Sequence, residues 1–207
     1  MLQYIIENWM DVLGTTLGLL YLYLEMKENI WMWIVGCVMP VIYIFVLYDK
    51  GIYADCAMEV YYFFAGLYGF IFWLRGKEKK GKPVEISHAP KKLKSMLWVY
   101  ALALWMLFGT ILKQYTDSTV PYTDGLTTAL SIIALWMLSR KYIEQWWVWF
   151  VVDFISTGLY IYKGIYGRSI LYGIYTSMAI YGYFVWKRRM NLKSSSLATG
   201  KAVDNKM

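Results

Sequence analysis

The feature that most constrains this chain is a series of apolar runs, each roughly 17–23 residues long and joined mostly by short polar segments. An α-helix of that length crosses the hydrocarbon core of a bilayer, which is about 30 Å thick. The sequence therefore predicts an all-α integral membrane protein of seven transmembrane helices. They are expected near residues 8–24, 30–48, 52–74, 96–113, 121–138, 146–162 and 165–186.

Composition indicates that lipid is the solvent for most of the chain. Hydrophobic residues make up 59% and aromatic residues 19% of its 207 residues, which is more apolar surface than a soluble fold of this size could bury. The 20 tyrosines and 11 tryptophans suit the two water interfaces of a bilayer. The net charge of +7 lies between and after the apolar runs, so it indicates orientation in a membrane and no nucleic-acid partner.

The basic residues also predict how the chain is oriented. With the N-terminus outside, 17 of the 21 lysines and arginines fall on the cytoplasmic side and four fall outside, as the positive-inside rule requires. Residues 1–190 are expected to form one transmembrane domain, with the N-terminus outside and the C-terminus in the cytoplasm. Residues 191–207 are polar and basic, and we expect them to form a disordered cytoplasmic tail.

The chain repeats part of its own sequence. Lys50-Gly51-Ile52-Tyr53 recurs 113 residues later as Lys163-Gly164-Ile165-Tyr166, and Tyr68-Gly69 recurs at the same offset as Tyr181-Gly182. Matches in the same order and at one offset are improbable by chance, even among so many aromatic residues. We therefore expect the first three helices to resemble the last three.

Two further matches extend this internal repeat. Trp73 recurs as Trp186 at the offset of 113, whereas Trp31-Met32-Trp33 resembles Trp147-Val148-Trp149 at an offset of 116. A single linker helix between two triplets gives both triplets the same orientation in the membrane, so the pattern predicts a 3+1+3 arrangement of parallel repeats with a pathway between them. Repeat one is expected over residues 8–74, the linker helix over 96–113 and repeat two over 121–186.

Charged residues within apolar runs are costly in a membrane and mark a pathway or a binding site by default. Trp146, Trp149 and Asp153 are spaced i, i+3, i+7, which places them on one face of the sixth helix. Aromatic rings beside a carboxylate suit a flat organic cation, through stacking, cation–π attraction and a counter-charge. The alternative for the tryptophans is anchoring at the cytoplasmic interface.

A second polar face lies in the third run. Asp55, Glu59 and Tyr62 are spaced i, i+4, i+7 and share one helical face. Glu59 lies deep within the run, so we expect it to take part in substrate binding together with Tyr62 and with Asp55 on the same face. The alternative for Asp55, which lies near the outer surface, is solvation or an ion pair with Lys50.

No motif for catalysis or for a cofactor accompanies these residues. The sequence contains no GxSxG, P-loop or HExxH pattern, and its single histidine, His88, has no metal ligand beside it in sequence. Cys37 and Cys56 lie in apolar runs without CxxC spacing. We therefore predict no enzymatic activity, no metal and no cofactor.

Several motifs together point to a known family. They are Trp146-x-x-Trp149-x-x-x-Asp153 with Lys141-Tyr142-Ile143-Glu144 before it and Tyr160-x-Tyr162-Lys163-Gly164 after it, and the third run from Tyr53-x-Asp55 through Tyr61-Tyr62 to Tyr68-Gly69 and Trp73. With these motifs, residues 8–187 resemble the Pnu vitamin transporters, whose sixth helix carries a WxxWxxxN/D motif.

The resemblance implies a fold and a function. The implied fold is a 3+1+3 bundle like a full-length, fused version of the sugar-transporting SWEET proteins, assembled as a homotrimer in the bacterial cytoplasmic (inner) membrane. The implied function is facilitated diffusion of an unphosphorylated vitamin, which a cytoplasmic kinase then traps by phosphorylation. Nicotinamide riboside, feeding NAD synthesis, is the expected substrate.

Two departures from the family pattern bear on the substrate. Glu59 stands where members that carry nicotinamide riboside usually have Gln, so thiamine transport is the alternative within the family. In the first repeat, Ile30, Trp33 and Cys37 stand where the Trp-Trp-Asp pattern would recur at the offset of 116. A non-transporting membrane scaffold is the alternative from another class, and an uptake assay separates it from a transporter.

Overall fold

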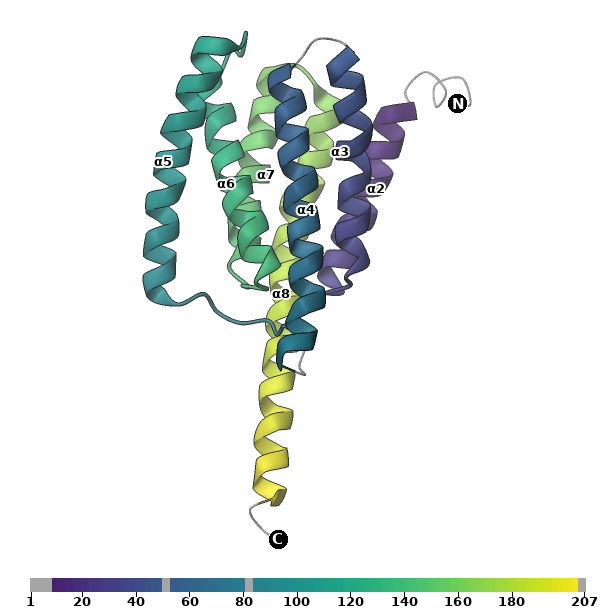
Figure 1. Ribbon diagram of the computed structural model, residues 1–207, viewed down its shortest axis with the longest axis vertical. Coiled ribbons are helices and arrows are strands. Elements are labelled where there is room, and N and C mark those ends of the chain that lie inside the picture. The colour runs from purple at the N-terminus through teal and green to yellow at the C-terminus, as the bar shows by residue number, and fades with distance from the viewer. Residues whose placement is uncertain (1–8, 50–52, 81–83, 205–207) are drawn as a thin grey trace. The chain divides into compact units, whose positions relative to one another are not determined.

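The computed structural model describes residues 9–49, 53–80 and 84–204, which form helices joined by turns and short loops (Figure 1). The predicted all-helical class is confirmed for this part of the chain. Each apolar run lies almost entirely within one helix. The helices are α2 (Trp9–Met26), α3 (Trp31–Asp49), α4 (Tyr53–Lys80), α5 (Lys91–Tyr115), α6 (Pro121–Ser139), α7 (Gln145–Tyr162) and α8 (Tyr166–Asp204).

Two helices continue well beyond the apolar runs that predict them. α4 extends to Lys80 and α8 extends to Asp204. For α8 this differs from the expectation that residues 191–207 lack regular structure, of which 205–207 lie outside the described ranges. The segment from 191 to 204 contains no proline, and a helix already formed in the apolar run propagates at little cost through its lysines, leucines and alanines.

The outer surface of the helices suits a bilayer. By length and composition alone, α3 and α5 are apolar enough to cross a membrane, and α2 carries a shorter apolar stretch from Val12 to Met26. Other helices also turn large apolar side chains outward. More than half of the surface of Phe64 in α4, Phe154 in α7 and Phe184 in α8 is exposed. Lipid satisfies such surface and water does not.

The chain divides into two compact units, residues 1–83 and residues 84–207. In the first unit, α3 contacts both α2 and α4. In the second unit, α5 contacts α6, α6 contacts α7 and α7 contacts α8. Buried residues of the loop before α5 and of α5, α6 and α7 form an apolar core in this second unit: Ala89, Ala101, Leu130, Ile133, Met137 and Val152.

The two units share one internal packing arrangement. Trp33 of α3 meets Trp73 of α4 with ring centroids 5.7 Å apart, and Trp146 of α7 meets Trp186 of α8 at 5.6 Å. In both pairs the ring planes are at 89°, so the contact is edge-to-face. Trp33 and Trp146 lie 113 positions apart in the sequence, and so do Trp73 and Trp186.

The turns that precede these tryptophans also correspond. Glu28, after α2, and Lys141, after α6, both adopt a φ of 54°, in the left-handed region that few residues other than glycine enter. Four backbone hydrogen bonds of the first turn, donated by residues 28, 29, 32 and 33, recur in the second turn 113 residues later. Glu28 and Lys141 are again 113 residues apart, so the repeat keeps a single offset through the turn.

This common offset corrects the sequence match at an offset of 116. Trp33 corresponds to Trp146, and Trp31-Met32-Trp33 therefore does not correspond to Trp147-Val148-Trp149. An offset of 116 would need three extra residues between α6 and α7, but four backbone hydrogen bonds recur through the two turns at the offset of 113. The aromatic richness of both helices explains why a shifted match looked convincing.

The corrected offset changes what stands in the first repeat where the Trp-Trp-Asp pattern would recur. The equivalent positions hold Trp33, Gly36 and Pro40, instead of Ile30, Trp33 and Cys37. One tryptophan is kept and no carboxylate is present, so the polar pattern of α7 is specific to the second unit.

Candidate functional site

The face of α7 predicted from sequence is turned into the second unit. Trp146 is 1% exposed and Asp153 is 7% exposed, while Trp149 is partly buried. Trp147, on another face of the helix, is 47% exposed. The i, i+3, i+7 spacing thus identifies the inward face of α7.

Trp146 is held by its neighbours in α8. Its ring makes the edge-to-face contact with Trp186 and lies directly against Gly182, where a Cβ atom would overlap it. Its buried Nε1 nonetheless has no hydrogen-bond partner among the described residues. The residue therefore packs α7 onto α8 and also presents an unused hydrogen-bond donor.

Trp149, one turn further along α7, packs against the apolar core formed by α5, α6 and α7. Its Nε1 is also buried, and no described residue accepts a hydrogen bond from it. An indole N–H usually finds a partner when it is buried. Two unused donors thus lie one turn apart on the same face.

Asp153 places a carboxylate on this face. Its backbone oxygen accepts a hydrogen bond from Thr157 Oγ1 at 2.7 Å, but no described residue gives its side chain a hydrogen bond or an ion pair. The phenol groups of Tyr172 and Tyr175 in α8 lie within electrostatic range of it. A buried carboxylate without a partner is costly, so this position calls for a cation or a hydrogen-bond donor from outside the unit's own side chains.

Two tyrosines near Asp153, Tyr172 and Tyr175, were missed by the sequence analysis, which quotes Tyr160 only as part of a family motif. Tyr160 and Tyr172 stack with ring centroids 5.1 Å apart, and the ring centroids of Tyr172 and Tyr175 are 5.7 Å apart. The i, i+3 spacing of Tyr172 and Tyr175 was the available signal. It did not stand out because tyrosines are frequent throughout this chain.

The predicted residues of the third run lie in the first unit. Glu59 and Tyr62 are partly buried on α4, and each has an interaction partner within the described residues. The backbone of Asp55 belongs to α4, but its side chain lies outside the described part of the structure. The part of these residues in substrate binding stays a prediction.

A carboxylate at the start of α7 ties three segments together. Glu144 Oε1 contacts Lys94 Nζ at 2.6 Å and His88 Nδ1 at 2.9 Å, and Oε2 accepts a hydrogen bond from the Ala89 N–H at 3.0 Å. Burial by itself raises the pKa of Glu144, but the hydrogen bonds from Ala89, Lys94 and His88 outweigh it and lower the pKa below its ordinary value. The carboxylate is therefore held in its charged form.

Backbone pairing reinforces this link. Residues 84–90, which we call the strap, lead into α5, and a parallel bridge pairs Ser87 with Tyr142. The Ser87 N–H donates to the Lys141 oxygen at 3.1 Å, and the Ile143 N–H donates to the Ser87 oxygen at 3.0 Å. The strap thus fixes the turn from which α7 starts, and with it the position of the inward face.

The chemistry available on the inward face is that of binding. It offers a carboxylate, two indole N–H donors and a wall of phenol rings, which suit a flat, polar, cationic ligand. Among the described residues, no group of three His, Cys, Asp or Glu side chains could hold a metal ion.

Comparison with known proteins gives consistent results. A family model described as nicotinamide mononucleotide transporter matches residues 8–188. The chain is 24% identical over 204 residues to the nicotinamide riboside transporter PnuC of Escherichia coli (strain K12), covering 86% of this chain and 85% of that protein. It is 25% identical over 195 residues to the riboflavin/roseoflavin transporter RibM of Streptomyces davaonensis, covering 93% and 91%.

A solved structure has the same fold. The crystal structure of the vitamin B3 transporter PnuC matches with a TM-score of 0.70 and 21% sequence identity, covering 89% of this chain and 84% of that one. At this level of identity the match speaks for the fold alone.

Proposed function

Because this chain belongs to the nicotinamide mononucleotide transporter family, we propose that it carries nicotinamide riboside across the bacterial cytoplasmic membrane by facilitated diffusion. The family and the relatives described above are membrane transporters, which confirms both the resemblance to the Pnu transporters and the expectation that the chain is not an enzyme. The substrate and the mode of transport are the proposed part.

The observation that carries the proposal is the set of unused polar groups on the inward face of α7. The Asp153 carboxylate and the Nε1 donors of Trp146 and Trp149 are buried, and described residues leave all three without a side-chain partner. A pyridinium ring would give the carboxylate its counter-charge and stack against aromatic rings. Amide and ribose oxygens of the same ligand would accept hydrogen bonds from the indole donors.

The proposed architecture follows from the internal repeat. Seven crossings in a 3+1+3 arrangement would form a single transporter domain over residues 1–190, with the N-terminus outside and the C-terminus in the cytoplasm. Glu59, Tyr62 and Asp55 of the first unit would also take part in substrate binding. Assembly as a homotrimer belongs to the same proposal.

A second candidate substrate has its own support. The similarity to RibM makes riboflavin an alternative, beside thiamine. Nicotinamide riboside and thiamine are cationic, whereas riboflavin is neutral. The buried carboxylate of Asp153 favours a cation, so nicotinamide riboside comes first.

The transport mode can be tested in proteoliposomes that contain the purified chain and no kinase. Labelled nicotinamide riboside should enter until its concentration inside equals that outside, because the sequence holds no nucleotide-binding motif to drive accumulation. An imposed proton or sodium gradient should leave this level unchanged. Accumulation above equality, or uptake no faster than into protein-free vesicles, would overturn the proposal.

Kinase trapping is tested by enclosing a nicotinamide riboside kinase and ATP in the same vesicles. Phosphorylation inside should then make the total labelled vitamin accumulate above the outside concentration.

A further inference from the structure

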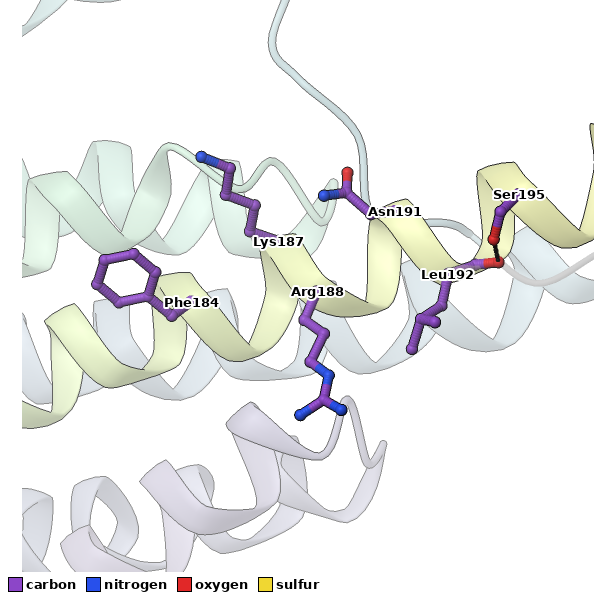
Figure 2. A pocket seen from close by; sticks show the side chains of 6 residues that line it. All are labelled: Phe184, Lys187, Arg188, Asn191, Leu192 and Ser195. Atoms are coloured by element: carbon purple, nitrogen blue, oxygen red, sulfur yellow. Dashed lines mark hydrogen bonds between the residues drawn. The ribbon is translucent and has the colours of Figure 1, made fainter.

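Where α8 leaves its apolar run, its surface forms a shallow groove of about 540 Å³, with all of the lining residues exposed. Figure 2 shows Lys187 and Asn191 along one edge and Arg188 and Leu192 along the other, with Phe184 nearer the apolar run. The lining residues are Phe184, Lys187, Arg188, Asn191, Leu192 and Ser195.

Within the described part of the chain, the two cations of this groove have no counter-ion. Neither Lys187 nor Arg188 forms an ion pair with a described residue, and the nearest noted contact of Lys187 Nζ is the Tyr183 ring, 5.7 Å from its centroid. Arg189 and Lys193, close by on the same helix, are both engaged with partners. The groove therefore presents two adjacent positive charges that are free to meet an anion.

The groove also has an apolar end. Phe184 is 59% exposed and precedes the two cations by about one helical turn, which is roughly 5 Å along the axis. That distance is similar to the depth of the headgroup layer on one side of a bilayer, about 5–7 Å. Phe184 therefore lies at the level of acyl chains when the cations lie at the level of phosphates.

We propose that this groove binds an anionic phospholipid of the leaflet at which the C-terminal part of α8 emerges. The Arg188 guanidinium and the Lys187 ammonium donate hydrogen bonds to the phosphate oxygens, and Arg188 can do so in a bidentate geometry. The Asn191 amide donates a further hydrogen bond, and an acyl chain lies along Phe184. A free phosphate ion would make no use of Phe184, so the apolar end of the groove favours a lipid.

The test uses the full chain, purified in neutral detergent and titrated with phosphatidylglycerol, with bound lipids counted by native mass spectrometry. Wild type should bind phosphatidylglycerol in preference to phosphatidylcholine. The double variant Lys187→Gln/Arg188→Gln should bind phosphatidylglycerol about tenfold more weakly, since each cation near an anionic lipid contributes several-fold in affinity. Its weak binding of phosphatidylcholine should not change.

A matched control separates lipid binding at this groove from general attraction of an anionic lipid to the positive charge of the chain. Lys91→Gln/Lys92→Gln removes the same charge from two exposed positions at the start of α5, and its phosphatidylglycerol binding should equal that of wild type. Equal losses in both double variants, or no preference for phosphatidylglycerol in wild type, would overturn the proposal. Equal binding of water-soluble glycerol 3-phosphate would also overturn it and would assign the groove to free phosphates. An oligomer that forms without lipid and dissociates only in Lys187→Gln/Arg188→Gln would overturn it too, and would assign the groove to a second copy of the chain.

Discussion

At the scale of single residues, Glu144 shows how one carboxylate can position a whole helix. It receives hydrogen bonds from the strap and from Lys94 in α5, and it is the N-cap residue immediately before α7. Its negative charge also lies at the N-terminal end of α7, where the helix dipole favours it. This contact fixes the start of α7 and thereby the position of the face that carries Trp146, Trp149 and Asp153.

This contact predicts a pH dependence of stability. Because the folded pKa of Glu144 is lowered, its contribution is fully present above the ordinary glutamate pKa of 4.5 and is lost as the pH falls through the lower folded value. Glu144→Gln should lower the stability at pH 7 by roughly 1 kcal/mol, and it should flatten the loss on acidification. Thermal unfolding in detergent between acidic and neutral pH measures both effects.

Glu85→Gln provides the control for Glu144→Gln. Glu85 lies in the strap and is exposed, so its neutralisation should change neither the stability nor its pH dependence. If the two variants behave alike, Glu144 does not hold the strap in the way that its contacts indicate.

Trp149 carries a second prediction, on binding. Trp149→Ala should weaken nicotinamide riboside binding about tenfold or more, because a cation–π partner and a hydrogen-bond donor are lost. Trp149→Phe keeps an aromatic face and removes only Nε1–H, so it should bind with intermediate affinity. Affinities are measured on purified, folded protein. Trp147→Ala, at the exposed neighbouring position, should bind like wild type. Unchanged affinity in Trp149→Ala would leave that residue with a packing role alone.

At the scale of helices, close packing around the paired tryptophans depends on glycine. A Cβ atom at Gly182 would overlap the Trp146 ring, and one at Gly69 would overlap the Trp33 ring. In each unit, therefore, an indole lies flat against the neighbouring helix backbone. In both units the second and third helices of the repeat thus pack through a tryptophan on one helix and a glycine on the other.

Gly182→Ala should consequently destabilise the second unit by about 1–3 kcal/mol, as overpacking does in other cores. Gly173→Ala is the matched control, because it lies in the same helix and a Cβ atom there meets nothing within 4 Å. That change should be neutral or stabilising by up to about 1 kcal/mol, since alanine favours helix. Chemical unfolding in detergent compares the two, and equal effects would show that the tryptophan contact does not limit packing.

The sequence was informative about elements and less so about contacts. The length of the apolar runs predicted every described helix, because membrane-spanning helices need about 20 apolar residues and leave a strong pattern. The offset of Trp33 in the repeat was wrong, because aromatic residues are too frequent to define an alignment by themselves. Tyr172 and the strap contact of Glu144 were missed because they depend on how separate segments pack, which residue spacing does not encode.

At the scale of the whole molecule, a single asymmetry stands out between the two units. Both contain the paired tryptophans, but only the second has Asp153, where Pro40 occupies the equivalent position of the first. A transporter built from two similar units would thus hold the charge of its substrate mainly on one of them. The central claim is that Asp153 supplies the counter-charge for a cationic vitamin.

Calorimetric titration of purified wild type and Asp153→Asn tests this claim most directly, because the substitution keeps the shape and hydrogen-bonding capacity and removes only the charge. Nicotinamide riboside should bind the variant about tenfold or more weakly, whereas neutral riboflavin, if it binds at all, should bind both proteins alike. Equal affinity of wild type and folded Asp153→Asn for nicotinamide riboside would contradict the account.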